Sequence, residues 1–581
     1  MDYDGNRLNN NRGRFVADFI ENDGQALSGR LELNWTNKHK RLLAHEDESY
    51  EWTNPSDYRV AEVRLLHDVG TVGEVNPNKQ RAADNLLIRG DALHVLTSLE
   101  HTPEFAREYA GKVRLVYIDP PFNTGQMFNN YNDALEHSVW LTMFRDRLLQ
   151  LRRLMSEDGS IWVHLDDVES HRARCVLDEV FGAENFVANI IWQKSHTREN
   201  RTDISTTHDN IIVYAVNRGV WKSKRNLLPS SEDQIARYSN PDNDPRGVWA
   251  SLPLHAKAEA GRRASQFYTI TTPSGRAVDP PAGRCWLYTA ERLKEMVADN
   301  RVWFGESGNN APRGKKFLSE VQTGLVPTSI WLYQEVGTTG TAKDELLRLL
   351  PEQTPFSTPK PERLMERIIQ VATNEGDIVL DCFAGSGTTA AVAHKMNRRW
   401  VTSEWSRDNT ENYILPRLTK VIEGTDLGGI TESQGWEGGG GFRVLEVAPS
   451  MFDVQDGRIV LAPWATDEAL AEAVAAQAGF DYTPEDVPFC GRKGRQRLAV
   501  IDGLVNPDVA ALLTAWLGDN EVLVVYGTAV DPDTRQALTT LRRGSQCRKV
   551  PQTLLNAYRR AASRDTMFTP APSMMSEGEG K

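Results

Sequence analysis

The stretch Asp119-Pro120-Pro121-Phe122 places a carboxylate, a conformationally fixed backbone and an aromatic ring next to one another. A carboxylate and a proline-fixed carbonyl can accept the two hydrogens of an exocyclic amine, and a phenyl ring can stack on a flat heterocycle. The preceding apolar run, 113–118, is short, rich in β-branched residues and ended by prolines, so it predicts a buried strand. Ligands of an open α/β sheet bind at the carboxyl ends of strands, where Asp119 is expected. Taken alone, the four residues fit a strand-ending turn with a capping aspartate equally well.

A second stretch, 381–389, reads Asp-Cys-Phe-Ala-Gly-Ser-Gly-Thr-Thr and lies between an apolar run and an alanine-rich run. The order of strand, glycine-rich turn and helix lets a ligand approach the backbone closely. The strict dinucleotide fingerprint GxGxxG is not met, because Ala390 stands where the third glycine would be, but a looser form accepts alanine and leaves a dinucleotide open. A further predicted strand, 400–404, ends at Glu404, whose carboxylate could hold two ribose hydroxyls. These features indicate a nucleoside-bearing cofactor.

Together, the two stretches resemble the motifs of S-adenosylmethionine-dependent amino-methyltransferases of DNA, D/N/S-P-P-Y/F/W for catalysis and D-x-F-x-G-x-G for the cofactor. The catalytic motif comes first in this chain, which is the permuted, β-group order. More specifically, the chain resembles the Mod subunits of type III restriction-modification systems over roughly residues 80 to 450. Further stretches that carry this resemblance are 85–93, 118–125, 178–186, 336–343 and 356–361.

The resemblance assigns roles to individual residues. The catalytic residues would be Asp119, Pro120, Pro121 and Phe122. The cofactor would be bound by Asp91, Lys360, Asp381, Phe383, Gly385, Gly387, Thr388 and Glu404. For Asp91 the alternative role is the N-cap of the helix that follows it, and for Lys360 it is a solvated surface lysine. No metal is expected at the site.

The resemblance also implies a reaction and partners. The expected reaction is site-specific transfer of a methyl group from S-adenosylmethionine to N6 of a flipped-out adenine in double-stranded DNA. Methylation of N4 of cytosine uses the same motif chemistry, but Asp rather than Ser at position 119 favours adenine. A non-catalytic DNA-recognition subunit of a defence complex is the other alternative, which the complete motifs disfavour. A second copy of the chain and a restriction (Res-type) or other defence subunit are the expected protein partners.

The elements that must position these residues alternate between strands and helices, which predicts an α/β fold. The resemblance specifies a permuted, doubly wound methyltransferase fold with an inserted target recognition domain and a small α/β C-terminal domain. The strands that end at Asp119 and Asp381 should then be neighbours where the strand order reverses. Residues 92–99, 138–156 and 362–373 are among the predicted helices.

Five segments are expected along the chain. They are an N-terminal wrapping or support segment (1–80), the catalytic half (81–189), the target recognition domain (190–330), the cofactor-binding half (331–430) and a C-terminal oligomerisation or partner domain (440–570). Residues 435–441 are predicted to be a flexible boundary, 31–35 a strand, 123–131 a mobile loop over the site and 573–581 a disordered tail.

Charge and composition limit the function classes. The segment 190–330 contains 20 Lys and Arg against 14 Asp and Glu, whereas the whole chain has a net charge of −12. A basic segment on an acidic chain suggests a localised phosphate-binding face, with an ordinary mixed surface as the alternative. No apolar run reaches the roughly 18 residues of a membrane span. The five scattered cysteines lack a CxxC pair and fit a reducing cytoplasm without a disulfide framework or zinc site.

Overall fold

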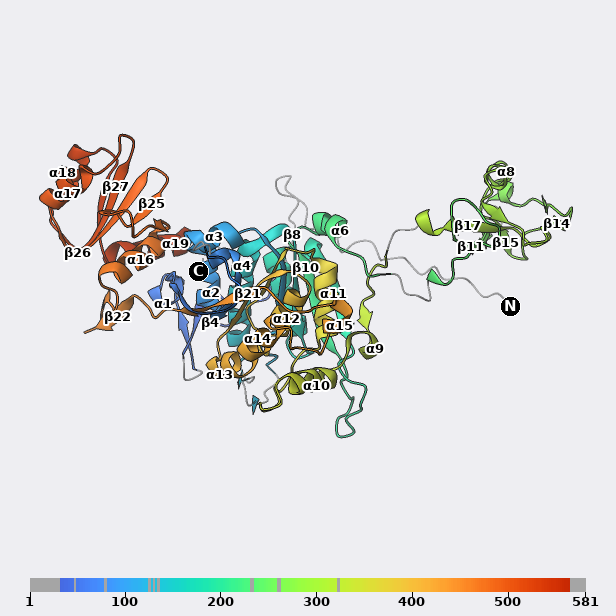
Figure 1. The fold of residues 1–581 in the computed structure, drawn as a ribbon, viewed down its shortest axis with the longest axis horizontal. Coiled ribbons are helices and arrows are strands. Elements are labelled where there is room, and N and C mark those ends of the chain that lie inside the picture. Colours follow the sequence, from blue (N-terminus) through green and yellow to red (C-terminus); the bar gives the residue numbers. More distant parts are fainter. Residues whose placement is uncertain are drawn as a thin grey trace, which may run out of the picture.

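The computed structural model describes residues 32–45, 49–77, 81–123, 127–128, 131–132, 136–229, 235–258, 263–320 and 324–564. The predicted mobile loop 123–131 lies largely outside these residues, and the predicted disordered tail 573–581 lies wholly outside them. Figure 1 shows a central body built around a large sheet, with a lobe from the middle of the chain at one end and the C-terminal elements at the other.

The central sheet has ten strands among the described residues. Its six middle strands, from β8 to β21, pair in parallel, as expected for a sheet covered by helices on both faces. The strands β10 and β3 pair antiparallel with their neighbours and lie outside this parallel core. In spatial order the strands are β18 (Ile330–Trp331), β9 (Phe186–Trp192), β10 (Asp209–Ala215), β8 (Met155–Leu165), β5 (Val113–Ile118), β19 (Ile378–Asp381), β20 (Arg399–Glu404), β4 (Asn85–Arg89), β21 (Gly441–Val447) and β3 (Leu66–Gly73).

The strands β5 and β19 are neighbours, with Val116 paired to Leu380. After β5 the chain proceeds outward to β8, and after β19 it proceeds in the other direction to β20. The strand order therefore reverses between β5 and β19, as predicted. Their carboxyl ends bring together two motifs that are far apart in the sequence.

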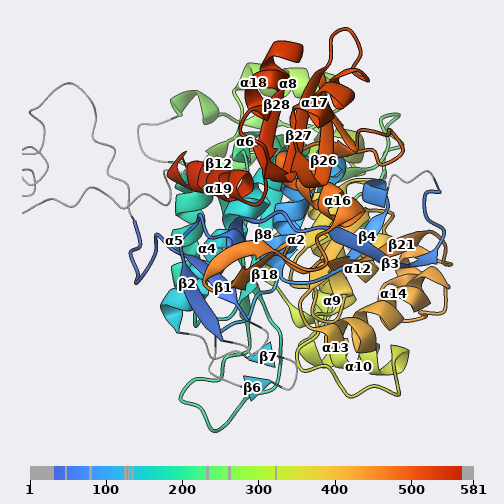
Figure 2. The ribbon, with the colours of Figure 1, turned by 90° about the vertical axis from the view of Figure 1, so that its left-hand side faces the viewer.

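Helices cover both faces of this sheet. Successive residues of β5 point to opposite sides, so Leu115 and Val116 belong to two different buried clusters. The Val116 side packs against α2 (Ala92–His101), α4 (His137–Leu154) and α5 (Ser170–Phe181). The Leu115 side packs against α11 (Glu362–Ala372), α12 (Thr388–Lys395) and α14 (Leu415–Ile422). Figure 2 shows α4 and α5 on one side of the body and α12 and α14 on the other, which confirms the doubly wound α/β fold.

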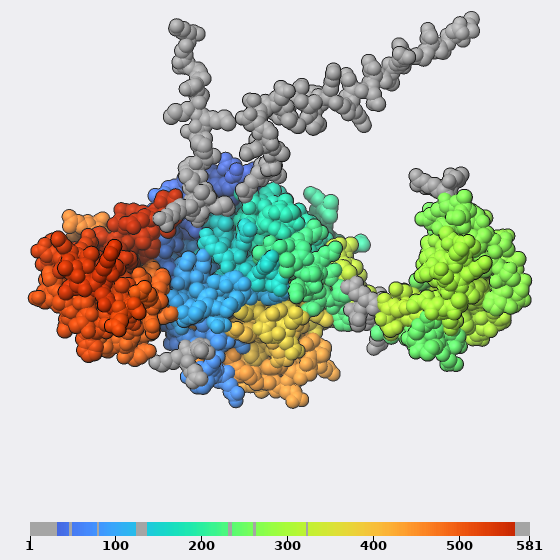
Figure 3. Space-filling model, turned by 90° about the horizontal axis from the view of Figure 1, so that it is seen from above, coloured from blue at the N-terminus to red at the C-terminus, as the bar shows by residue number. Residues whose placement is uncertain are grey.

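The lobe formed by the middle of the chain contains fewer residues than the predicted segment 190–330. Strands β9 and β10 belong to the central sheet, and β10 is buried along its whole length because it pairs on both edges. The separate lobe contains a three-stranded sheet of β11 (Trp249–Pro253), β17 (Arg313–Phe317) and β16 (Val302–Trp303), together with α8 (Ala290–Ala298). Figure 3 shows this lobe standing apart from the body. The predicted start at residue 190 was therefore too early.

Both flanking segments contribute strands to the central sheet. Strand β3, from the predicted N-terminal segment, pairs with β21, which belongs to the predicted C-terminal segment. Residues 435–441 are not a free linker, because Gly439 N donates to Ile422 O and His394 Nε2 contacts Gly439 O at 3.0 Å. The expectation of a strand over 31–35 was wrong for its described residues, 32–35, which form no strand.

The C-terminal part is an α/β unit, as predicted. Its five-stranded sheet has the order β24 (Asp481–Tyr482), β25 (Gly491–Lys493), β26 (Gln496–Val505), β27 (Val522–Val530) and β28 (Gln546–Lys549). The helices α16 (Asp467–Ala478) and α18 (Thr534–Leu541) belong to this unit. Among the helices that the structure describes, none is both long and apolar enough to cross a membrane.

Candidate active site

A cavity of about 550 Å³ opens at the carboxyl ends of β5, β19 and β20. Most of the predicted site residues line it, although they come from distant parts of the chain. Those that do are Asp91, Asp119, Pro121, Lys360, Asp381, Phe383, Gly385, Thr388 and Glu404. Pro120, Phe122 and Gly387 are not among the lining residues. No group of three or more His, Cys, Asp or Glu in the described part of the chain is arranged to hold a metal ion.

The carboxylate of Asp119 has one engaged and one unengaged oxygen. Its Oδ2 accepts a hydrogen bond from Lys360 Nζ in an ion pair. Its Oδ1 is buried and has no hydrogen-bond partner among the residues that the structure describes. A buried acceptor without a donor is unfavourable by about 1–3 kcal/mol, so the site contains an acceptor suited to an incoming N–H group.

The ring of Phe122 lies behind the cavity rather than on its wall. It stacks on His164, with ring centroids 5.9 Å apart and an interplanar angle of 21°, and Lys360 Nζ lies 5.3 Å from its centroid. His164 Nδ1 contacts Tyr117 Oη at 2.9 Å, and its Nε2 contacts Asp209 at 3.2 Å. Burial lowers the pKa of His164, so a neutral imidazole supports the Phe122 ring.

Asp381 uses both carboxylate oxygens within its own loop. Oδ1 accepts from Phe383 N at 2.9 Å, and Oδ2 accepts from Thr389 Oγ1 at 2.6 Å. Burial raises the pKa of Asp381 to about 7; the negative charge of Asp119 acts in the same direction, while the hydrogen bonds oppose the shift. Asp381 therefore ties the end of β19 to the start of α12 and shapes the turn between them.

The two glycines of this turn have left-handed backbone conformations. Gly385 has φ +54°, and a side chain there would point toward Phe356, another cavity residue. Gly387 has φ +77° and is the N-cap of α12. Its added Cβ would lie 3.1 Å from the side chain of Ile414. Gly387 thus sets the path of the turn without lining the cavity.

Two further predicted carboxylates are held in place by the backbone. Glu404 accepts from Gly385 N at 2.9 Å and from Ser406 N at 3.0 Å, and burial raises its pKa. Asp91 caps α2 by accepting from Leu93 N at 2.6 Å, and it also accepts from Arg147 at 2.9 Å. Asp91 therefore lies at the N-cap of α2 and also lines the cavity.

Several cavity residues were missed by sequence reasoning. Arg147 is a charged residue of α4 that is only 4% exposed, but Arg145 and Asp146 of the same helix are buried as well, so no signal in the sequence singles out Arg147. Trp405 is 44% exposed and directly follows Glu404, so an exposed aromatic beside a predicted ligand could have been noticed. Tyr50, from the short strand β2 (Tyr50–Thr53) of the N-terminal segment, has no comparable signal in the sequence.

Comparison with known proteins gives one family match. The family described as DNA methylase (N6_N4_Mtase) matches residues 113–413, which include both motifs. The type III restriction-modification enzyme StyLTI Mod subunit of Salmonella typhimurium is 31% identical over 352 residues, or 55% of this chain and 51% of that protein. The EcoP15I Mod subunit of Escherichia coli is 29% identical over 432 residues, or 62% of this chain and 64% of that protein.

A shorter relative is matched along almost all of its length. The type II methyltransferase M1.MboII of Moraxella bovis is 48% identical over 315 residues, which make up 53% of this chain and 90% of that protein. By contrast, the chain spans only about half to two thirds of the length of the two Mod subunits.

Proposed function

Because the chain belongs to the DNA methylase family, we propose that it transfers a methyl group from S-adenosylmethionine to N6 of adenine at a specific site in double-stranded DNA. One observation carries this proposal: Asp119, whose buried Oδ1 accepts no hydrogen bond within the described part of the chain, and the glycine turn after Asp381 line the same cavity. The names of the Mod subunits support a role in restriction-modification.

The residues on the β19 side of the cavity suit the cofactor. The carboxylate of Glu404, held by Gly385 N and Ser406 N, would accept hydrogen bonds from ribose hydroxyls. The absence of a side chain at Gly385 leaves room for close approach of a ligand to the backbone. When bound, S-adenosylmethionine supplies a methyl group attached to a positively charged sulfur.

The residues on the β5 side suit the acceptor. A base must leave the helix to reach the cavity, at a cost of a few kcal/mol. Asp119 Oδ1 would accept one hydrogen of the exocyclic amine and the Pro120 carbonyl the other, which fixes the direction of the nitrogen lone pair. Holding the two reactants side by side can lower the activation barrier by on the order of 7–11 kcal/mol.

Lys360 is paired with Asp119 in this structure. The resemblance assigns Lys360 to the cofactor, where its ammonium suits the carboxylate at the methionine end. We propose that Lys360 exchanges Asp119 for the cofactor carboxylate on binding. This exchange would leave Asp119 with both oxygens available and full negative charge for the amine.

The lobe and the partners complete the proposal. The lobe around β11, β16 and β17 would read the DNA sequence, because it stands apart from the sheet and leaves the cavity undisturbed. A second copy of the chain and a Res-type subunit are proposed as protein partners by analogy with the Mod subunits. Exchange of residues 229–324 for those of a relative should change the methylated sequence and keep the methylated base.

The direct test is methyl transfer by the purified chain. The chain is incubated with radiolabelled S-adenosylmethionine and double-stranded DNA that contains many sequences, and the product nucleosides are separated. We expect N6-methyladenine. Label in N4-methylcytosine would assign the chain to the other reaction of the family. No label from a folded chain that binds the cofactor would indicate a non-catalytic recognition subunit.

A further inference from the structure

A second hollow, of about 260 Å³, lies in the separate lobe, away from the catalytic cavity. Its lining includes two tryptophans, two arginines, two serines and an asparagine, and none of the described residues that line it is acidic. Trp303 is partly exposed, whereas Trp249 is buried beneath it with ring centroids 5.6 Å apart. An aromatic floor with a cationic rim suits a flat ring that carries an anion.

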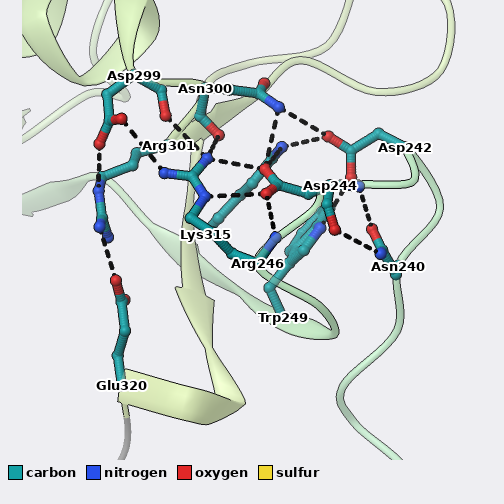
Figure 4. Close-up of polar contacts among 10 residues, drawn as sticks. All are labelled: Asn240, Asp242, Asp244, Arg246, Trp249, Asp299, Asn300, Arg301, Lys315 and Glu320. Atoms are coloured by element: carbon teal, nitrogen blue, oxygen red, sulfur yellow. Dashed lines mark hydrogen bonds and ion pairs between the residues drawn. The ribbon is translucent and has the colours of Figure 1, made fainter.

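The tryptophan floor is held by a buried ionic cluster, which Figure 4 shows. The ammonium of Lys315 is fully buried and paired with Asp242 and Asp244, and it lies 5.2 Å from the ring centroid of Trp249. Trp249 Nε1 donates to Asp242 at 2.9 Å. The hydrogen bond from Arg246 lowers the pKa of Asp244, with the other hydrogen bonds acting in the same direction. The carboxylates therefore stay charged, and the floor is fixed before any ligand arrives.

The cations at the rim differ from those of the cluster. Arg313 and Lys315 are alternate residues of β17 and share one face of the sheet. Of these two cations, Lys315 is the one that forms ion pairs with Asp242 and Asp244. Arg313 is exposed, and its guanidinium donates to the side chain and the carbonyl of Ser251. Arg237 is exposed as well, and neither Arg237 nor Arg313 has a carboxylate partner among the described residues. Both guanidinium groups can therefore receive a phosphate.

Asn310 adds a group that can recognise a base edge. Its side chain lies over Gly305, where an added Cβ would come within 2.3 Å of Asn310 Nδ2. Gly305 has φ +81°, so both its conformation and the close approach require glycine. An amide that projects into the hollow can donate to and accept from the edge of a nucleobase.

We propose that this hollow binds one unstacked nucleotide of the DNA target, other than the adenine that is methylated. The base stacks on Trp303, its edge faces Asn310, and Arg237 and Arg313 hold the adjacent phosphate. This inference rests on the proposed function for the identity of the DNA. The lobe thereby recognises a nucleotide that has left the helix, in addition to any groove contacts.

The test compares three variants of the full chain. Trp303→Leu removes the stacking surface, Arg237→Gln removes one rim charge, and Arg292→Gln is the matched control. Arg292 is an exposed arginine of α8 in the same lobe, paired with Glu295 and outside the hollow. Cofactor binding and circular dichroism establish that each variant is folded. Should Trp303→Leu fail to fold, Arg237→Gln carries the test, because Arg237 is exposed.

The first measurement uses labelled single-stranded octanucleotides and does not depend on methylation. Dissociation constants are obtained from fluorescence anisotropy. The dissociation constant of Trp303→Leu should be roughly 5- to 100-fold higher than that of wild type, because the variant no longer stacks on one base. Arg237→Gln should weaken binding less, and Arg292→Gln should bind like wild type. Equal affinity of wild type and Trp303→Leu would overturn the proposal, even if the chain methylates DNA normally.

The second measurement uses duplexes with the methylated sequence and places a mismatch at each position in turn. A mismatch lowers the cost of unstacking, so it should tighten binding by wild type at the target adenine and at one further position. At that further position Trp303→Leu and Arg237→Gln should lose the gain, whereas the gain at the target adenine remains. Tightening confined to the target adenine would contradict the proposal. Uniform weakening by Arg237→Gln, with no effect of Trp303→Leu, would also contradict it and indicate a simple phosphate contact.

Discussion

Asp119 and Asp381 end neighbouring parallel strands and line the same cavity, yet their carboxylates are used differently. Both oxygens of Asp381 accept hydrogen bonds from its own loop. Asp119 has one oxygen paired with Lys360 and one that is buried and has no partner in the part of the chain that the structure describes. The first carboxylate has its hydrogen-bonding capacity satisfied by the fold, whereas the second retains capacity for a ligand.

The difference separates two ways in which a motif residue can serve a reaction. Asp381 shapes the turn that receives the cofactor, so its effect on the chemistry is indirect. Asp119 is placed to contact the reacting amine, so its effect is direct. Substitutions at the two positions should therefore change different measured quantities.

The largest effect is expected for Asp119→Ala. Removal of a preorganised group at the reacting atom typically lowers the rate by about 10² to 10³. Methyl transfer to DNA should fall by at least about 100-fold, while the dissociation constant for S-adenosylmethionine changes little. The measurements are incorporation of radiolabel and calorimetric titration of the cofactor. Full activity of the variant would mean that Asp119 does not hold the acceptor.

Asp381→Ala provides the contrast. It removes the acceptor for Phe383 N and Thr389 Oγ1, so the turn loses the two hydrogen bonds that connect it to the end of β19. The dissociation constant for the cofactor should rise, whereas the maximal rate at saturating cofactor should fall less than in Asp119→Ala. A reversed pattern, with cofactor binding preserved and turnover lost, would place Asp381 at the acceptor.

The next effect in size concerns the glycine turn. Gly385→Val should weaken cofactor binding by about tenfold or more, because a side chain would enter the cavity and the residue would be strained at φ +54°. Gly376→Val is the matched control: Gly376 has φ +80° and empty space around it, but it lies outside the cavity. Equal loss of cofactor binding in both variants would attribute the effect to backbone strain alone.

A smaller effect is expected for Lys360→Met. A hydrogen bond to a charged group contributes about 1.5–3 kcal/mol. Because Lys360 would give up its pairing with Asp119 in exchange, the net loss should lie at the lower end of this range, and cofactor binding should weaken by about tenfold. Lys343→Met, on α10 (Thr339–Leu349) and outside the cavity, should leave affinity unchanged. Unchanged affinity in Lys360→Met would show that this lysine serves Asp119 only.

The smallest effect is on the pH dependence of stability. The pKa of Asp381 is raised from 3.8 to about 7 in the folded chain. A carboxyl with a raised pKa favours the folded state when protonated, so its contribution is complete below pH 4 and is lost as the pH rises toward 7. Between pH 4 and 7, the melting temperature of Asp381→Asn should therefore change by a few degrees less than that of wild type. An identical slope for variant and wild type between pH 4 and 7 would contradict the raised pKa.

The sequence predicted those elements whose structure is determined by a few consecutive residues. The strand predicted over 113–118 is β5, with the same bounds. The glycine turn after Asp381 leads into the helix α12, as predicted. Each of these two signals lies within a stretch of a few consecutive residues. The adjacency of β5 and β19 was also predictable, because ligand sites of doubly wound sheets lie where strand order reverses.

The remaining features depend on contacts between distant segments. The pairing of Lys360 with Asp119 and the stacking of Phe122 on His164 join residues whose individual types indicate neither contact. The place of β10 in the central sheet was missed because the surrounding Gly, Pro and Arg residues favoured an irregular insert. Sequence patterns identify elements, but they do not state which elements pair.

The most direct test of the central claim is methylome sequencing of cells that express either the wild-type chain or Asp119→Ala. We expect N6-methyladenine at one defined sequence with wild type and its absence with the variant, at equal protein levels. N4-methylcytosine with wild type, or the same adenine modification with both proteins, would contradict the account.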